Sequence, residues 1–200
     1  MSAHRNLRSL SGALIGAGLM AGAALGAAAE RAGTEAGSWQ SHTYQFHFMG
    51  FTATYSCDGL GDKLQLLLRL AGARADAKVM PTCARGYGVP DKLADAQVVF
   101  STLQPAAGAG NNADEGAAGS WRHVELAPQH PFALQTGDCE LVEQFRDTLL
   151  PMFATRNLKS QINCVPHQES GSNFHLSFDV LAPLPPANAP AVKGPAAKGA

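Results

Sequence analysis

The hydrophobic pattern of the chain changes period several times between residues 38 and 182. Apolar and polar residues alternate from Tyr44 to Phe48 and from Phe174 to Val180, which is typical of strands with one buried face. Two segments that begin at Cys57 and Cys139 instead place apolar residues on one side of a 3.6-residue period and predict amphipathic helices. These stripes are Leu60, Leu64, Leu67, Leu68 and Ala71, and Leu141, Phe145, Leu149, Met152 and Phe153. The pattern predicts an α+β fold with two helices packed on one side of an antiparallel sheet.

The two halves of this region repeat one order of features. Each opens with a tryptophan and an alternating segment, continues with a second short apolar segment and a cysteine that starts a helix, and ends in a second cysteine and a Phe-x-x-Leu-x-Pro strand. These features are Trp39, 42–48, 51–55, Cys57, Cys83 and 100–105, and then Trp121, 122–126, 132–136, Cys139, Cys164 and 178–183. We expect an internal duplication of a β-β-α-β-β unit, over 38–104 and 121–182. A unit this small has a marginal core alone, so joining two units is physically expected.

Local signals place the ends of the two helices. Gly72 is predicted to end the first helix in a left-handed conformation, and Asp138 to occupy the N-cap of the second. Pro151 is expected to bend or shorten the last turn of the second helix.

Three other segments lack a periodic pattern and are expected to be disordered. They are 30–37, the Gly/Ala-rich segment 105–120 and the Pro/Ala-rich segment 183–200. Small side chains cannot bury a face, so 105–120 is predicted to be a flexible linker between the two copies. The C-terminal composition is typical of an extended tail.

The N-terminal segment, 1–29, has the composition of a signal peptide. Its first part, 1–12, carries two arginines and no acid, 13–25 is apolar, and Ala27, Ala28 and Ala29 offer a cleavage site, as export signals do. A retained membrane helix is the alternative, but roughly 17 apolar residues are at the short limit for spanning a bilayer. We expect cleavage and a mature protein that is periplasmic or secreted and has no contact with the membrane.

The four cysteines are predicted to form disulfides, because compartments beyond the inner membrane are oxidising. Of the three possible pairings, the repeat favours one bridge within each copy: Cys57 with Cys83, and Cys139 with Cys164. Each bridge would contribute roughly 3 to 4 kcal/mol by closing a loop of the unfolded chain. The alternative is a metal site at Cys164 and His167, although the paired Cys-x-x-Cys motifs of structural zinc sites are absent from the sequence.

Charge and motifs exclude several classes of function. Between residues 37 and 183, ten Lys and Arg are scattered among fourteen Asp and Glu, so we expect no nucleic-acid partner. Residues 169–173 lack the Gly-x-Ser-x-Gly frame of a nucleophile elbow, and 58–62 lack the terminal Glu of a calcium loop. The acids near the helix starts are interpreted as favouring the helix dipole, the strand histidines as surface or structural residues, and both tryptophans as caps over the core. These acids are Asp58, Asp62, Asp138, Glu140 and Glu143, and the histidines are His42, His47, His123 and His175.

The sequence thus predicts an exported protein with no catalytic residues, metal or cofactor that a motif would reveal. The leading hypothesis is a non-catalytic module that binds another envelope or secreted protein, a peptide or an envelope component. One alternative is a hydrolase-like enzyme whose site is assembled from residues distant in sequence. A second is a metal carrier that uses His and Cys side chains.

Overall fold

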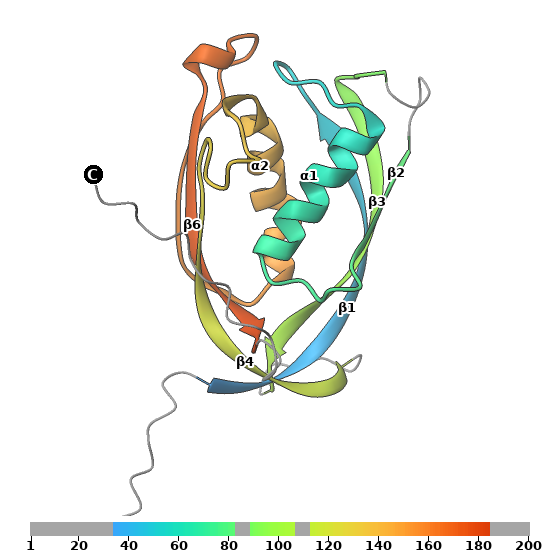
Figure 1. The fold of residues 1–200 in the computed structure, drawn as a ribbon, viewed down its shortest axis with the longest axis vertical. Coiled ribbons are helices and arrows are strands. Elements are labelled where there is room, and N and C mark those ends of the chain that lie inside the picture. The colour runs from blue at the N-terminus through green and yellow to red at the C-terminus, as the bar shows by residue number, and fades with distance from the viewer. Residues whose placement is uncertain (1–33, 83–88, 107–112, 185–200) are drawn as a thin grey trace, which may run out of the picture. The chain divides into compact units, whose positions relative to one another are not determined.

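The computed structural model describes residues 34–82, 89–106 and 113–184. They form a six-stranded antiparallel sheet, in the order β2-β3-β1-β4-β6-β5, and two α-helices (Figure 1), so the predicted α+β class is confirmed. The predicted signal peptide at 1–29, Cys83 and the chain after residue 184 lie outside the described residues. Within these residues, no helix combines the length and the apolar character that crossing a membrane requires.

The elements follow the order β-α-β-β twice. Residues 34–106, here called the first half, contain β1 (Thr34–Met49), α1 (Cys57–Leu70), β2 (Lys78–Thr82) and β3 (Leu93–Pro105). Residues 113–184, the second half, contain β4 (Ala113–Leu126), α2 (Cys139–Thr148), β5 (Thr155–Asn163) and β6 (Asn173–Pro183). Short 3-10 turns η2 (Thr136–Asp138), η3 (Leu150–Met152) and η4 (Glu169–Gly171) lie before α2, after α2 and before β6.

The second strand that the sequence predicts in each copy is not a strand in the structure. Residues 51–55 form a loop, because the N–H groups of 51–53 donate to the carboxylate of Glu140. Residues 132–136 lie in a turn whose N–H groups bond locally, since Leu134 donates to the carbonyl of Pro131. The described elements of each half are therefore β-α-β-β, and the predicted β-β-α-β-β order is wrong.

The segments 30–37 and 105–120, expected to be disordered, are partly strand. β1 and β4 begin inside them, and these strand ends pair with each other in antiparallel register. Small residues are needed where the strands pack closely: a Cβ on Gly119 would lie 2.5 Å from Leu103 Cδ2. The Gly/Ala composition of the end of this segment therefore reflects close packing, and the prediction of a flexible linker is wrong from residue 113 onward.

The pairing of β1 with β4 joins two three-stranded arms that diverge from it (Figure 1). The first arm consists of β2, β3 and β1, and the second arm of β4, β6 and β5. Both helices lie between the arms, where their apolar stripes contact the inner face of each. The helices are thus covered on two sides by strands of one sheet.

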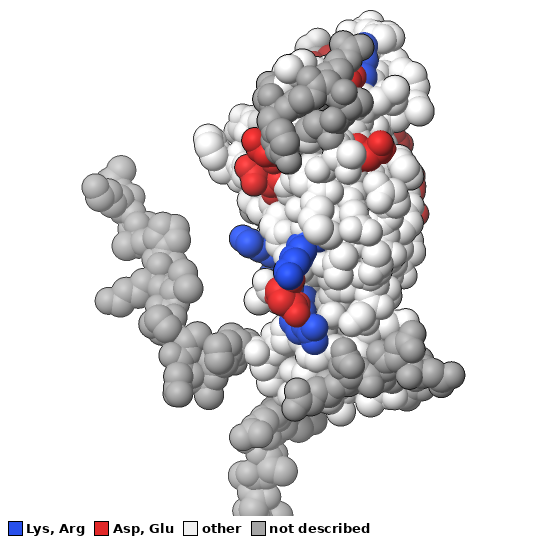
Figure 2. All heavy atoms as spheres, turned by 90° about the vertical axis from the view of Figure 1, so that its right-hand side faces the viewer, with Lys and Arg blue, Asp and Glu red and all other residues white. Residues whose placement is uncertain are grey.

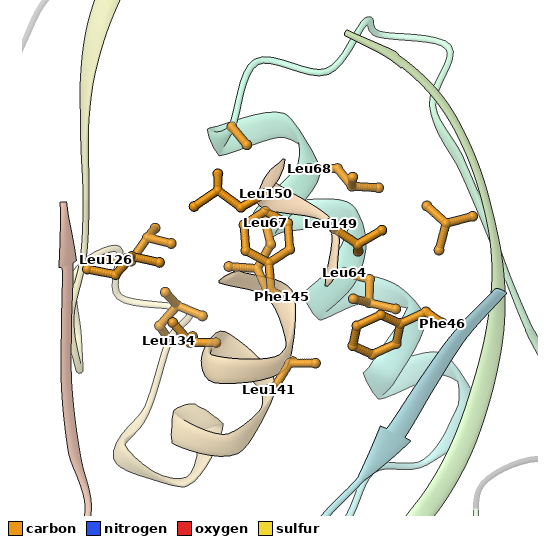
Figure 3. Close-up of a cluster of buried hydrophobic side chains, with 14 of the residues drawn as sticks. Phe46, Leu64, Leu67, Leu68, Leu126, Leu134, Leu141, Phe145, Leu149 and Leu150 are labelled. Atoms are coloured by element: carbon orange, nitrogen blue, oxygen red, sulfur yellow. The ribbon is translucent and has the colours of Figure 1, made fainter. Parts of the chain in front are cut away.

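The core is built from the helix stripes that the sequence predicts. The α1 stripe is buried, and Gly72 ends the helix at φ +86° as expected. In the second stripe, Leu149 and Phe153 are buried beyond the end of α2, which stops at Thr148 before Pro151. Figure 3 shows side chains of both helices meeting between Phe46 of β1 and Leu126 of β4.

A smaller apolar cluster lies where the arms join. Trp39, Leu103 and Leu181 are its buried members, and Trp121 packs against them. An arginine guanidinium lies over each indole ring, Arg74 at 5.6 Å from Trp39 and Arg156 at 4.2 Å from Trp121. The tryptophans therefore lie at the end of the core where the two arms join, in agreement with their interpretation as caps.

Candidate functional site

One predicted disulfide is present in the second half, next to residues that contact the first half. Cys139, at the start of α2, is bonded to Cys164 just after β5, with a Cα–Cα distance of 5.6 Å. This confirms the second predicted pairing. It also removes the Cys164 sulfur from the metal site considered with His167. Cys83 lies outside the described residues, so the bridge from Cys57 to Cys83 stays a prediction.

Asp138, the residue before this cysteine, is a buried carboxylate that receives hydrogen bonds from both halves. The Tyr55 hydroxyl donates to its Oδ1 at 2.5 Å, and Lys63 Nζ and the backbone N–H of Gln135 donate to its Oδ2 at 2.6 and 2.7 Å. Lys63 Nζ also donates to the carbonyl of Ala133. Asp138 occupies the N-cap position of α2 as predicted, but its side chain makes no capping hydrogen bond to the helix.

Glu140, the residue after the cysteine, binds backbone instead of side chains. Its buried carboxylate accepts from the N–H groups of Phe51, Thr52 and Ala53 at 3.0 to 3.3 Å. The Thr52 hydroxyl continues the contact, because it donates to the carbonyl of Val165 and accepts from the N–H of His167. The loop 50–56 of the first half is thereby fixed to both ends of the disulfide.

Loop 50–56 and the turns η2 and η4 line an open cavity of about 300 Å³ between the halves. We call it the interhalf cavity. Its lining is polar apart from Ala53, and it is contributed by both halves: Thr52, Ala53, Thr54, Tyr55, Gly137, Asp138 and Glu169. The volume is at the lower end of the range of small-molecule sites, about 300 to 1,000 Å³.

The electrostatics of the interhalf cavity are set by the Tyr55–Asp138–Lys63 contacts. Burial raises the pKa of the Tyr55 phenol far above its ordinary value, and the neighbouring Asp138 carboxylate adds to the shift. The phenol therefore stays protonated and keeps its hydrogen bond to Asp138 at any ordinary pH. Lys63 supplies the counter-charge at 2.6 Å, as a buried carboxylate requires.

This arrangement is suited to holding a shape rather than to accepting a proton. Both oxygens of Asp138 already accept donors, and Glu140 is turned toward the loop backbone. A general base needs a lone pair within reach of the proton that it removes. At the interhalf cavity, Tyr55 and Asp138 are therefore fixed polar groups, and Glu169 is an exposed carboxylate at its edge. Among the described residues, no group of three His, Cys, Asp or Glu side chains is close enough to hold a metal ion.

The strand histidines each contact a partner on the neighbouring strand of the sheet. His47 lies 2.6 Å from Asp95, His123 lies 2.9 Å from Asp179, and His175 lies 3.0 Å from Glu125. His42 lies 2.9 Å from the Thr102 hydroxyl, and burial lowers its pKa. The structure thus places these four histidines in separate side-chain pairs.

The side of the first arm shows scattered charges. In Figure 2, Lys and Arg alternate with Asp and Glu and leave wide uncharged areas between them. No continuous stripe of one sign crosses the described part of this face, as the mixed charge pattern of the sequence predicts.

Sequence analysis did not predict the contacts of Asp138 and Glu140 with the first half: it interpreted both as acids favouring the helix dipole, and Asp138 also as the N-cap of the second helix. Their partners Tyr55, Lys63 and loop 50–56 lie in the first half of the chain, so a local pattern could not reveal the contacts. The one available signal is their position on either side of Cys139. Comparison of the chain with protein-family models, with curated proteins and with solved structures finds no match.

Proposed function

We propose that the chain is an exported, non-catalytic binding protein whose partner contacts the interhalf cavity. The observation that carries this proposal is the cavity itself, in which Tyr55 of the first half and Asp138 of the second half are held in place by internal hydrogen bonds. A preformed site binds with a smaller entropy cost than one that must be ordered by its ligand. The full use of the Asp138 oxygens within the chain favours binding over acid-base catalysis.

The expected compartment supports the choice of partner. Residues 1–29 have the composition of an export signal, and the Cys139–Cys164 bridge is compatible with an oxidising environment. The partner is then another envelope or secreted protein, a peptide or an envelope component.

An internal duplication of a β-α-β-β unit is the proposed origin of this scaffold. The pairing registers support it, because Trp39 lies opposite Leu103 on β3 and Trp121 lies opposite Leu181 on β6. Ala36 and Ala118 are separated in sequence by the same interval as the two tryptophans, and they lie directly opposite each other where the arms join. A two-fold relation between two copies requires such a pair.

The arginines that lie over the tryptophans, and the helix starts, fit the same two-fold relation. Arg74 and Arg156 are separated in sequence by the same number of residues as Trp39 and Trp121, and so are Cys57 and Cys139. The interhalf cavity then lies at the opposite end of the helices from the strand crossing. It has no internal symmetry, because the first half contributes one loop and the second half contributes the two turns η2 and η4.

Cross-linking in envelope extract tests the proposal. The mature chain is compared with Thr54→Trp, which places an indole in the interhalf cavity at an exposed position, and with Thr43→Trp on the outer face of β1. We expect the mature chain and Thr43→Trp to capture the same partner and Thr54→Trp to lose it, with equal thermal stability of all three. Absence of any captured partner, or equal capture by Thr54→Trp, would contradict the proposal.

A further inference from the structure

A second cavity lies on the outer face of the second arm, away from the helices. Its volume is about 380 Å³, and we call it the β5 pocket. Its lining comes from β4, β5 and β6: His123, Asn157, Leu158, Lys159, Ser177 and Asp179. The residues of β6 that line it alternate with the buried residues Leu176, Phe178 and Val180, which face the core.

An irregularity of β5 shapes this pocket. Arg156 is paired with Asp179 and Lys159 with Ser177, and the two residues between them leave the ladder. One of them, Asn157, has a φ of +55°, a left-handed conformation that asparagine tolerates better than most residues. β-Bulges commonly redirect side chains next to functional sites.

One side of the pocket is a carboxylate whose hydrogen bonds are already made. Asp179 accepts from His123 Nδ1 at 2.9 Å, from Asn157 Nδ2 at 2.7 Å and from Arg156 Nε at 3.4 Å. The hydrogen bond from His123 is the main cause of a lowered pKa of the Asp179 carboxyl. Asp179 therefore stays ionised and fixes the orientation of the imidazole through Nδ1, which leaves Nε2 for another partner.

Two donors in the pocket, the Ser177 hydroxyl and the Lys159 ammonium, are not used within the described part of the chain. Ser177 is only 6% exposed and its Oγ has no hydrogen-bond partner in the part of the chain that the structure describes. Lys159 Nζ likewise makes no hydrogen bond or ion pair with described residues, and Lys159 is paired with Ser177 across the two strands. The nearby carboxylate of Glu125 is paired with His175. The Ser177 hydroxyl lines the pocket, so it is open to a ligand there.

We propose that the β5 pocket binds an oxyanion, the carboxylate or phosphate group of a small ligand. Lys159 Nζ and Ser177 Oγ donate to the oxyanion, and Leu158 contacts the apolar part of the ligand. This site is separate from the interhalf cavity and does not depend on the function proposed for that cavity.

The test follows amide NMR signals of the mature chain during titration with inorganic phosphate and, separately, with acetate. We expect saturable shifts at residues 157–159 and 177–179, with the stronger response identifying the preferred oxyanion. Lys159→Gln should weaken binding about tenfold, because it removes a charge-assisted hydrogen bond. Ser177→Ala should weaken binding about fivefold, because it removes a neutral hydrogen bond. Both variants should keep the melting temperature of the parent chain.

Lys78→Gln is the matched control. Lys78 lies on β2, the edge strand of the first arm, where it is paired with Val99 of β3. Its replacement should leave both titrations unchanged. Absence of saturable shifts with either anion would overturn the proposal. Shifts that persist unchanged in Lys159→Gln and Ser177→Ala would also overturn it, because they would show that the anions bind elsewhere.

Discussion

At the scale of single residues, the two acids beside Cys139 divide the contacts between the halves. Asp138 binds the side chains of Tyr55 and Lys63, and Glu140 binds the backbone of loop 50–56. Each carboxylate is buried, so each must receive enough donors to replace the water that it loses. The polar groups that line the interhalf cavity are therefore fixed by the same contacts that stabilise the fold.

Replacing Asp138 by Asn is expected to destabilise the protein by about 3 kcal/mol, because Lys63 loses its buried counter-charge. The measurement is the free energy of unfolding in urea. Asp147→Asn is the control, because Asp147 is an exposed carboxylate that pairs with Arg146. This variant should lower the free energy of unfolding by less than about 1 kcal/mol. Equal losses in the two variants would show that the Asp138 contacts have no special weight.

His42 gives a prediction for pH. Burial lowers its folded-state pKa below the unfolded value of 6.5, so the unfolded chain binds a proton first as pH falls. This residue therefore costs no stability above that pH and reduces stability progressively below it. We expect the parent chain to lose more stability than His42→Gln between about pH 7.5 and about pH 5. Melting temperatures at both pH values measure this, and parallel losses in the two proteins would rule it out.

At the scale of elements, β4 shows how close packing decides what a Gly/Ala-rich segment becomes. Gly119 lies beneath Leu103 and Leu181, whose side chains meet over the strand. A larger residue there would separate the arms at their crossing. The helices differ from β4 in this respect, because their periodic apolar stripes predict them from nearby residues alone. The sheet then covers these stripes.

Gly119→Ala is expected to destabilise the protein by about 2 kcal/mol, because the added methyl would lie 2.5 Å from Leu103 Cδ2 and 3.1 Å from the Ala182 carbonyl. Gly116→Ala on the same strand is the matched control, since its nearest contact would be the carbonyl of Gly37 at 3.6 Å. Thermal unfolding should separate the two variants. Similar melting temperatures would contradict the close packing that we describe.

Removal of the Cys139–Cys164 bridge tests how α2 is held. The double variant Cys139→Ala, Cys164→Ala should lose about 3 kcal/mol of the free energy of unfolding. The bridge joins two cysteines with a sequence separation of 25, so its removal gives the unfolded chain more conformational entropy. Amide exchange should increase first at Val165 and His167 and in loop 50–56, because Thr52 contacts the chain just after Cys164. Uniform loss of protection across the sheet would instead indicate global destabilisation without a local role.

At the scale of the whole molecule, the two halves contact each other at both ends of the helices. Strand pairing between β1 and β4 joins them at one end, and side-chain contacts join them at the other. There, Gln144 of α2 accepts from the N–H of Met49 and donates to its carbonyl, next to the contacts of Glu140. The interhalf cavity lies at the end that depends on side chains, so a single substitution can alter it.

Glu140→Gln tests this end of the molecule. The new glutamine side chain replaces one carboxylate oxygen by an N–H donor, next to three backbone N–H groups that need acceptors. We therefore expect the free energy of unfolding to fall by about 2 kcal/mol. Hydrogen exchange at residues 51–53 should rise well before exchange in the β1–β4 pairing. Glu143→Gln, on the more exposed side of α2, is the control and should leave exchange at 51–53 unchanged. Slow exchange at these amides in Glu140→Gln would exclude the proposed role of the carboxylate.

Features set by neighbouring residues were predictable from the sequence alone. The stripes of α1 and α2, the stop at Gly72 and the Cys139–Cys164 bridge all follow from local periodicity, from glycine stereochemistry or from the repeat spacing. Such features depend on residues close in the chain or on a covalent bond. Their physical cause is therefore visible before the fold is known.

The tertiary structure decided the features that depend on distant partners. Residues 51–55 are a loop because Glu140, in the other half of the chain, binds their N–H groups, and the start of β4 is a strand because β1 pairs with it. The interhalf cavity and the β5 pocket arise in the same way, since each gathers side chains from segments that only the fold brings together. A hydrogen bond between distant residues leaves no periodic trace in a sequence, and this is the physical reason why neither site could be predicted.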